Sequence, residues 1–329
     1  MSVRKFSILR VTVLVLLAGV SLAAVEAAVD ASKKEGVIWR DPRGRVNLYY
    51  GSGSKAGEPR GPFRFFKEDT SGSSPKYIVR DRDGVRWKVK LGPESQAEIA
   101  ASRLVWAAGF FTHEGYLVPE LHLESIPNHL KRDKLIEDDG VMRNASMKRE
   151  PHDEKKLGNW KWGENPFKDS REWNGLRVVM ALLNNWDVKD VNNGVYKHHG
   201  ERIYMVSDLG ATFGASGRSF PASKSKNNYE VYRESKFICG DTADLVDFCA
   251  PSRANIAHLV DPIEFGRRLG LRWIGEDIPR PDAQWIGEIL GRLSHEQIRD
   301  AFRAGGYSPG EIEGFADVIE GRIAELRKL

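Results

Sequence analysis

Three polar side chains in one short loop, with a fourth beyond it, are the residues best suited to chemistry. Asp187, Lys189 and Asn192 share the loop Asn184–Asn193, and Asp208 follows a short way downstream. Asn192 and Asp208 offer an amide oxygen and a carboxylate oxygen but no soft ligand, a combination that suits Mg²⁺ or Mn²⁺. The types and spacing therefore indicate a divalent-cation site. The alternative is an ordinary polar loop between a helix and a strand.

The elements on either side of this loop would hold it in place. A capped helix is predicted from Asp169-Ser170 through Leu183, because apolar residues recur there at helical spacing. After the loop, Val195-Tyr196, a turn at Gly200 and the run Ile203–Val206 predict a hairpin that leads into Asp208-Leu209-Gly210.

The order Asp-x-Lys-x-x-Asn, hairpin, Asp-Leu-Gly resembles the catalytic and metal-binding loops of the protein-kinase-like superfamily. The chain is similar to atypical, exported members, in the company of secreted and lipid-kinase-like enzymes. The resemblance implies that Asp187 orients or deprotonates an acceptor hydroxyl and that Lys189 steadies the transferring phosphoryl group. Asn192 and Asp208 would then hold Mg²⁺ (or Mn²⁺) against the phosphates of ATP.

Two departures from the family pattern affect this assignment. Asn185-Trp186 stand where kinases have His-Arg, which removes any arginine link to an activation-loop phosphate. Asp190 lies near Asp187 and Asn193 lies beside Asn192, so the sequence leaves open which aspartate and which asparagine match the motif.

The region upstream has the element order of a kinase-like small lobe. Strands are predicted at Phe63–Phe66, Lys76–Arg80 and Val85–Leu91, with a small-residue turn at Glu68–Pro75 and a helix over Pro93–Ala108. The resemblance places the loop Thr70–Ser74, with Ser71, Gly72 and Ser73, over the nucleotide phosphates as backbone N–H donors. This loop departs from Gly-x-Gly-x-x-Gly, and a solvent-exposed turn is the alternative.

A lysine and a glutamate complete the implied nucleotide site. Lys88 and Lys90 alternate onto one strand face, and Lys90 is favoured as the ATP ligand because it lies nearer the strand end and the helix. Glu98 is its expected partner on the helix. The alternatives are an exposed strand face for both lysines, and a capping box in which Ser95 and Glu98 only tie down the helix start.

The fold class expected is α+β: a bilobal protein-kinase-like fold with a small antiparallel β lobe carrying one helix, and a larger, mainly helical lobe. The boundaries predicted are residues 62–125 for the small lobe and 126–329 for the large lobe, after an extended lead-in over 28–61 in which Val46–Tyr50 could form a strand. Further strands are expected at Tyr116–Leu123 and Val141–Arg143. Residues 211–236 resemble an activation or substrate segment. Helices are expected over 252–259, 261–270, 282–293, 294–304 and 309–328.

The first 27 residues have the pattern of a signal peptide. Arg4, Lys5 and Arg10 precede the apolar run Val11–Val20, and small residues follow. We expect the protein to be exported, periplasmic or secreted, with no stable membrane span after cleavage; an uncleaved anchor is the alternative. In an oxidising compartment Cys239 and Cys249 are expected to form a disulfide, the alternative being two buried thiols.

Composition narrows the function classes. The chain of 329 residues is 41% hydrophobic and 29% charged, as a globular protein is. Its formal net charge of +4 is too small to indicate nucleic-acid binding, and basic runs such as Lys131-Arg132 and Lys148-Arg149 are interpreted as solvated faces. Gly-x-Ser-x-Gly and His-Glu-x-x-His are both absent from the sequence, which argues against the corresponding hydrolases.

The sequence is compatible with three functions. The first is a kinase-like phosphotransferase that binds a nucleotide and acts on an unknown acceptor, which could be a protein, lipid, sugar or small molecule. The second is an enzyme of the same fold that transfers AMP. The third is a non-catalytic binding or scaffold protein.

Overall fold

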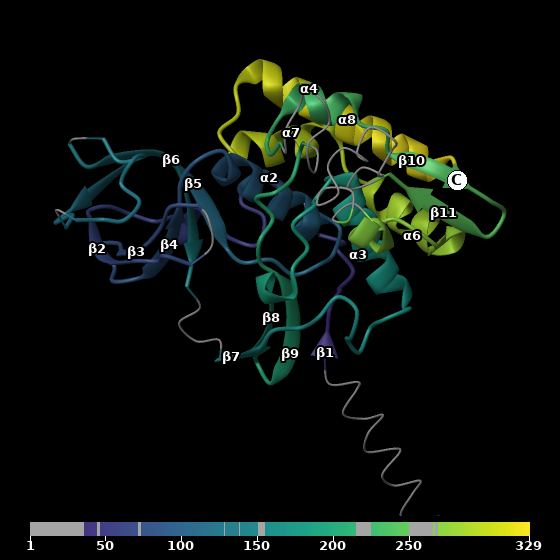
Figure 1. Ribbon diagram of the computed structural model, residues 1–329, viewed down its shortest axis with the longest axis horizontal. Helices are drawn as coiled ribbons and strands as arrows, with labels where there is room; N and C mark the ends of the chain where they lie inside the picture. The colour runs from purple at the N-terminus through teal and green to yellow at the C-terminus, as the bar shows by residue number, and fades with distance from the viewer. Residues whose placement is uncertain are drawn as a thin grey trace, which may run out of the picture.

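A five-stranded barrel lies at one end of the molecule and a group of helices at the other in the computed structural model (Figure 1). The structure describes residues 36–44, 47–71, 74–127, 129–137, 139–150, 155–214, 225–249, 266 and 269–329. The expected signal peptide, Gly72, Ser73, the helix over 252–259 and most of the helix over 261–270 lie outside these residues. The fold is mixed, with both helices and sheets.

The barrel is formed by β2 (Phe63–Glu68), β3 (Lys76–Arg80), β4 (Arg86–Lys90), β5 (Gly115–Glu124) and β6 (Val141–Arg149). Its strand order is β2-β3-β4-β6-β5, with antiparallel neighbours except for the parallel pair β2–β5 that closes it. Alternate residues of each strand, such as Tyr77, Val79 and Trp87, fill the interior. The residues between them, including Lys88 and Lys90, therefore lie on the outer face of the sheet.

Helix α2 (Glu94–Ala107) follows β4 directly and contacts β5, β6 and helix α7 (His295–Ala304). Gly92 precedes this helix with a φ of 93°, which glycine adopts without strain. Pro93 follows, and its fixed φ suits a helix start. Its small and apolar residues, among them Ala97, Ala101 and Leu104, are fully buried. This packing fixes the side of α2 that carries Glu94 and Glu98 next to the end of β4.

A second sheet has the order β1-β9-β8-β7. It contains β1 (Gly36–Val37), β7 (Lys155–Gly158), β8 (Asn193–His198) and β9 (Glu201–Val206). The turn between β8 and β9 uses His199 and Gly200, both with positive φ, as a tight two-residue hairpin requires. The predicted hairpin is therefore confirmed.

The helical part is built around α3 (Arg171–Leu182), which Ser170 caps by accepting a hydrogen bond from the Trp173 N–H at 3.2 Å. Around it lie α4 (Tyr229–Glu234), α6 (Arg280–Leu290), α7 (His295–Ala304), α8 (Pro309–Arg327) and a small sheet of β10 (Ile238–Asp241), β11 (Leu245–Phe248) and β12 (Ile278–Pro279). Short 3₁₀ turns cover Lys55–Gly57, Asp190–Asn192 and Arg272–Ile274. The predicted capped helix from Asp169-Ser170 through Leu183 is confirmed, and α7 and α8 lie where helices were expected over 294–304 and 309–328.

The two cysteines are joined, as expected. Cys239 in β10 and Cys249 just after β11 form a disulfide with their Cα atoms 5.1 Å apart. Within the described residues, no helix is long and apolar enough to cross a membrane.

Two element predictions need correction. The run Val46–Tyr50 could have formed a strand, but Val46 lies outside the described residues and Asn47 holds a turn. The Asn47 carbonyl accepts from Gly51 N at 3.0 Å, and its Oδ1 accepts from Tyr50 N at 3.2 Å. Leu48 in this turn is fully buried. The strand expected over Val141–Arg143 extends to Arg149, because its later residues also alternate between barrel interior and surface.

Candidate active site

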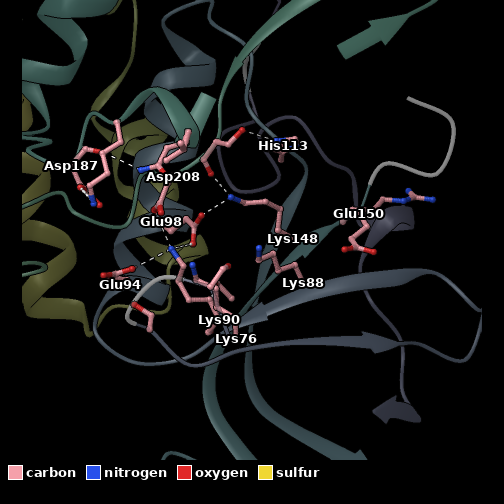
Figure 2. A pocket seen from close by; sticks show the side chains of 18 of the residues that line it. Lys76, Lys88, Lys90, Glu94, Glu98, His113, Lys148, Glu150, Asp187 and Asp208 are labelled. Atoms are coloured by element: carbon pink, nitrogen blue, oxygen red, sulfur yellow. Dashed lines mark hydrogen bonds and ion pairs between the residues drawn. The ribbon is translucent and has the colours of Figure 1, made fainter. Parts of the chain in front are cut away.

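A cavity of about 550 Å³ lies between the outer face of the barrel and the loops that follow α3 and β9 (Figure 2). Strands β3, β4 and β6 and helix α2 provide one wall, and residues 187–192 and 207–208 the other. The cavity brings together every described residue that the sequence proposed for the site, namely Ser71, Lys90, Glu98, Asp187, Lys189, Asn192 and Asp208. Gly72 and Ser73 lie outside the described residues.

Lys90 lies among three carboxylates. Its Nζ is 3.0 Å from Glu98 Oε2, 3.2 Å from Glu94 Oε2 and 3.1 Å from Asp208 Oδ1. Only 7% of the side chain is exposed. Burial alone would lower the pKa of Lys90, but the charges of Glu98, Asp208 and Glu94 outweigh it and raise the pKa. The lysine therefore stays charged at every physiological pH.

Glu98 does not act as a helix cap. The helix starts at Glu94, and the Ser95 hydroxyl donates to the Lys90 carbonyl at 2.8 Å, so the capping-box alternative is wrong. The second oxygen of Glu98 is 2.6 Å from Lys148 Nζ. Burial would raise the pKa of Glu98, but Lys148 and Lys90 outweigh this effect and hold the pKa below its ordinary value. Glu98 is thus an ionised bridge between two lysines.

Asp208 and Asn192 present oxygens to the cavity. Asp208 Oδ1 accepts from Lys90 and from the Gly210 N–H at 3.3 Å, and Oδ2 has no hydrogen-bond partner among the described residues. Burial alone would raise the pKa of Asp208. The charges of Lys90 and Lys148 have the larger, opposite effect and hold the pKa below its ordinary value. Asn192 donates through Nδ2 to the Asp187 carbonyl at 3.2 Å, which leaves Oδ1 available. A carboxylate and an amide oxygen fit a hard divalent cation.

The loop after α3 is held by its own polar groups. Asn185 Oδ1 accepts from the Asp187 N–H at 3.1 Å, and the bond from Asn192 closes the loop from its other end. Lys189 Nζ lies 2.5 Å from Asp187 Oδ1. These contacts set Asp187, Lys189 and Asn192 along one edge of the cavity.

The two residues that could also match the motif, Asp190 and Asn193, lie away from the cavity. Asp190 Oδ1 accepts from the Trp162 N–H at 3.0 Å, and Asn193 donates to the Trp160 carbonyl at 3.4 Å. Neither lines the cavity, whereas Asp187 and Asn192 do.

Lys88 and Ser71 are engaged differently from Lys90. Lys88 Nζ is 2.6 Å from Asp69 Oδ2, and Asp69 Oδ1 accepts from both the N–H and the hydroxyl of Ser71, at 3.0 and 2.6 Å. The Ser71 N–H, expected to face a phosphate, therefore already has an acceptor. Lys88 stabilises the position of this loop through Asp69.

The sequence missed several cavity residues. Lys148, interpreted as part of a solvated face, instead alternates with the interior residue Met147 on β6 and faces the cavity. Glu94 stands four residues after Lys90, a spacing that could have revealed it. Lys226 pairs with Glu94 and lies 5.4 Å from the Trp186 ring, a contact between distant segments that no local pattern predicts.

His113 is also part of this network. Its Nε2 is 2.9 Å from Ser207 Oγ, next to Asp208, and Lys148 donates to the Ser207 carbonyl. Burial, followed by the charge of Lys148, lowers the pKa of His113 to about 3. The imidazole is therefore neutral at physiological pH and holds the Ser207 side chain next to Asp208 by a hydrogen bond.

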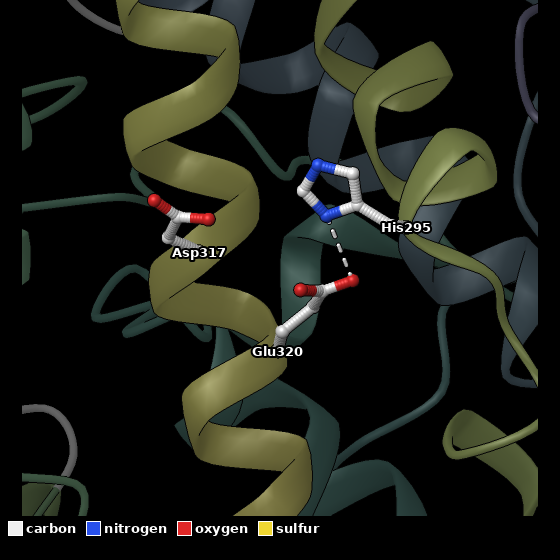
Figure 3. Close-up of side chains that lie close together, drawn as sticks. All are labelled: His295, Asp317 and Glu320. Carbon is white, nitrogen blue, oxygen red and sulfur yellow. Dashed lines mark ion pairs between the residues drawn. The ribbon is translucent and has the colours of Figure 1, made fainter.

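A second group of potential metal ligands lies on the outer side of the helices. His295 at the start of α7 faces Asp317 and Glu320 on α8 (Figure 3), with ligand atoms within 4.8 Å of one another. His295 Nδ1 is 3.0 Å from Glu320 Oε1, and Nε2 is 3.5 Å from Glu313 Oε2. Exposed pairs of this kind join neighbouring helices without a metal, and we assign the group that role.

No protein-family model matches the chain, and no curated protein matches its sequence. Among solved structures, the chain is similar to the crystal structure of a Helicobacter pylori proinflammatory kinase, CtkA, with a TM-score of 0.44 and 10% sequence identity. The match covers 80% of this chain and 95% of that chain. A likeness this distant supports no argument about the activity of this protein.

Proposed function

We propose that this protein is an exported, ATP- and Mg²⁺- (or Mn²⁺-) dependent phosphotransferase with a bilobal, protein-kinase-like fold. The observation that carries the proposal is the buried ion pair of Lys90 and Glu98, which meets Asp208 at 3.1 Å from Lys90 in the cavity that Asp187 and Asn192 also line. A fixed cation beside two oxygen donors for a metal is the arrangement that binds and activates a polyphosphate.

Each residue has a role that its contacts support. Lys90 binds phosphate oxygens of the nucleotide, and Glu98 positions it while also holding Lys148. Asn192 and Asp208 hold the divalent cation, which neutralises charge on the phosphates when bound. The low pKa of Asp208 keeps this carboxylate ionised and available to a metal.

The transfer step places Asp187 at the acceptor. The bond between the terminal phosphorus and its bridging oxygen breaks, the acceptor oxygen bonds to that phosphorus, and the acceptor proton passes to the Asp187 carboxylate. Lys189, 2.5 Å from Asp187 Oδ1, lies where it can steady the transferring group. The acceptor is a protein, lipid, sugar or small molecule, and nucleic acid is not among the partners we propose.

Export is supported by two features that are independent of the cavity. The first 27 residues have the charge and hydrophobicity pattern of a signal peptide. The disulfide between Cys239 and Cys249 suits an oxidising compartment.

The test compares two aspartates whose proposed roles differ. Asp208→Ala removes a metal ligand, so Mg²⁺-dependent ATP binding should weaken by about tenfold or more together with turnover. Asp187→Ala removes a group used at the acceptor, so turnover should fall by about a hundredfold while ATP affinity stays near that of the wild type. Binding is measured by calorimetry and turnover by hydrolysis of γ-labelled ATP.

Asp317→Ala, on the exposed side of α8, is the matched control and should change neither quantity. If the wild type binds no ATP with Mg²⁺ or Mn²⁺, the proposal is wrong. Binding without turnover would support a non-catalytic protein. Release of the γ label as diphosphate, and not as phosphate, would support AMP transfer.

A further inference from the structure

The lining of the cavity is unusual in its charge. Among the described lining residues, eight are lysine or arginine and five are aspartate or glutamate, a surplus of three positive charges. Val191 and Tyr196 are the apolar members of this described set. Small-molecule sites are lined mostly by hydrophobic and aromatic side chains, with a few polar groups for orientation. Within the described lining, His113 and Tyr196 are the ring side chains on which a nucleotide base could stack, whereas many charged groups are present to bind an anion.

The cations are concentrated on one face of the sheet by strand register. Lys76 in β3 lies directly opposite Lys90 in β4, and Lys88 in β4 lies directly opposite Lys148 in β6. All four side chains line the cavity (Figure 2). Like charges directly opposite each other on a sheet repel. Carboxylates offset this repulsion at Lys88, Lys90 and Lys148, and an anionic ligand would offset what remains.

Lys76 is the member of this face least balanced by acids. Lys90, Lys88 and Lys148 each have a carboxylate within 3.2 Å, whereas Lys76 has no ion pair among the described residues. Its side chain is partly buried, and burial together with the charge of Lys90 lowers its pKa. Asp208 and Asp69 act on Lys76 from beyond ion-pair distance, so a counter-charge in direct contact with this partly buried cation would come from a ligand.

We propose that this site recognises its phosphoryl donor by the polyphosphate chain and not by the base, so that inorganic triphosphate serves in place of a nucleoside triphosphate. The inference rests on the proposed phosphotransferase function and names its donor class. Lys76, Lys88 and Lys148 extend the phosphate-binding surface beyond Lys90. With inorganic triphosphate, the terminal P–O bond breaks, the acceptor oxygen takes the phosphoryl group, its proton passes to Asp187, and inorganic diphosphate leaves.

The direct test compares donors in the full-length protein with Mg²⁺ present. Calorimetry should give dissociation constants for inorganic triphosphate, ATP and GTP that agree within about threefold, and adenosine should not bind measurably. ATP binding that is about tenfold tighter than that of inorganic triphosphate and GTP would overturn the inference while leaving the proposed function intact. Failure of all three triphosphates to bind would overturn both.

Substitution of Lys76 tests whether the lysines of β3, β4 and β6 bind the phosphates. Lys76→Gln should weaken inorganic triphosphate and ATP by the same factor, about fivefold or more, because both use the same chain of phosphates. The melting temperature should stay level or rise, since one like-charge pair is removed. Lys67→Gln, at an exposed position on the neighbouring strand β2, is the control. If Lys76→Gln leaves both affinities at the level of Lys67→Gln, the inference is wrong.

Discussion

Two buried cations, one in the cavity and one in the helical core, are held in opposite ways. Arg322 of α8 donates to the Leu182 carbonyl at 2.7 Å, to the Tyr232 carbonyl at 3.1 Å and to the Ser235 hydroxyl at 2.7 Å. Its guanidinium carbon lies 4.0 Å from the centre of the Tyr232 ring. Lys90 is equally buried but is surrounded by three carboxylates.

The difference separates a cation that joins chain segments from one that we propose binds a ligand. Backbone carbonyls at the end of α3 and around α4 are fixed by the fold, so Arg322 ties these elements to α8. Arg177 repeats the pattern with the Trp273 and Glu276 carbonyls. The carboxylates around Lys90, in contrast, are anionic groups that a metal ion can also bind. Equal burial therefore says little about role, whereas the chemistry of the partner says a great deal.

The largest expected effect is on stability in the helical core. Arg322→Leu leaves several buried acceptors without a donor, each worth about 1–3 kcal/mol, so the free energy of unfolding should fall by about 3 kcal/mol or more. Urea unfolding measures the loss. Arg327→Leu, exposed on the same helix, should change it by about 0.5 kcal/mol or less. Equal effects of the two variants would contradict the structural role of Arg322.

The next effect is on turnover in the cavity. Lys90→Met should lower the rate of ATP hydrolysis by about a hundredfold, the scale for loss of one fixed charge at a phosphoryl group. Its free energy of unfolding should fall less than that of Arg322→Leu, because Glu98 keeps Lys148 and Glu94 keeps Lys226. Lys161→Met, at an exposed surface pair, is the control. An Lys90→Met protein of wild-type activity would place the site elsewhere.

The smallest expected effect is a difference between the two regions in how the cost of a substitution depends on pH. The folded-state pKa of Glu98 is lowered, so its carboxylate stabilises the fold above the unfolded value of about 4 and loses that contribution as pH falls. Glu98→Gln should therefore cost on the order of 1 kcal/mol near neutral pH and less below about pH 4. The cost of Arg322→Leu, whose partners do not titrate, should be constant from pH 3 to 7. Chemical unfolding across this range checks both, and parallel curves would refute the contrast.

Local patterns in the sequence predicted the elements well. Strand β3, the capped helix α3, helix α7 and the β8–β9 hairpin follow from strand alternation, helical spacing, a cap and turn residues, which are short-range properties. The turn at Asn47 was missed because an Asn side chain competed with a strand pattern through its own hydrogen bonds.

The candidate site could be predicted where its residues follow one another closely, as Asp187, Lys189 and Asn192 do. The cross-strand positions of Lys76 and Lys148 depend on the register of β3, β4 and β6, which sequence spacing alone does not determine. The pairing of Lys226 with Glu94 joins segments far apart in the chain. These contacts arise from tertiary packing, so no local pattern could reveal them.

The short strand β1 has a practical consequence for handling the protein. Gly36 and Val37 pair in parallel with Arg202 and Ile203 and so cover the outer edge of β9. A shortened chain that starts at residue 62, where the sequence suggests a lobe boundary, would lose β1 and expose that edge. Bare strand edges pair with other molecules and drive aggregation. Expression of residues 62–329 without the preceding residues should therefore give poorly soluble protein.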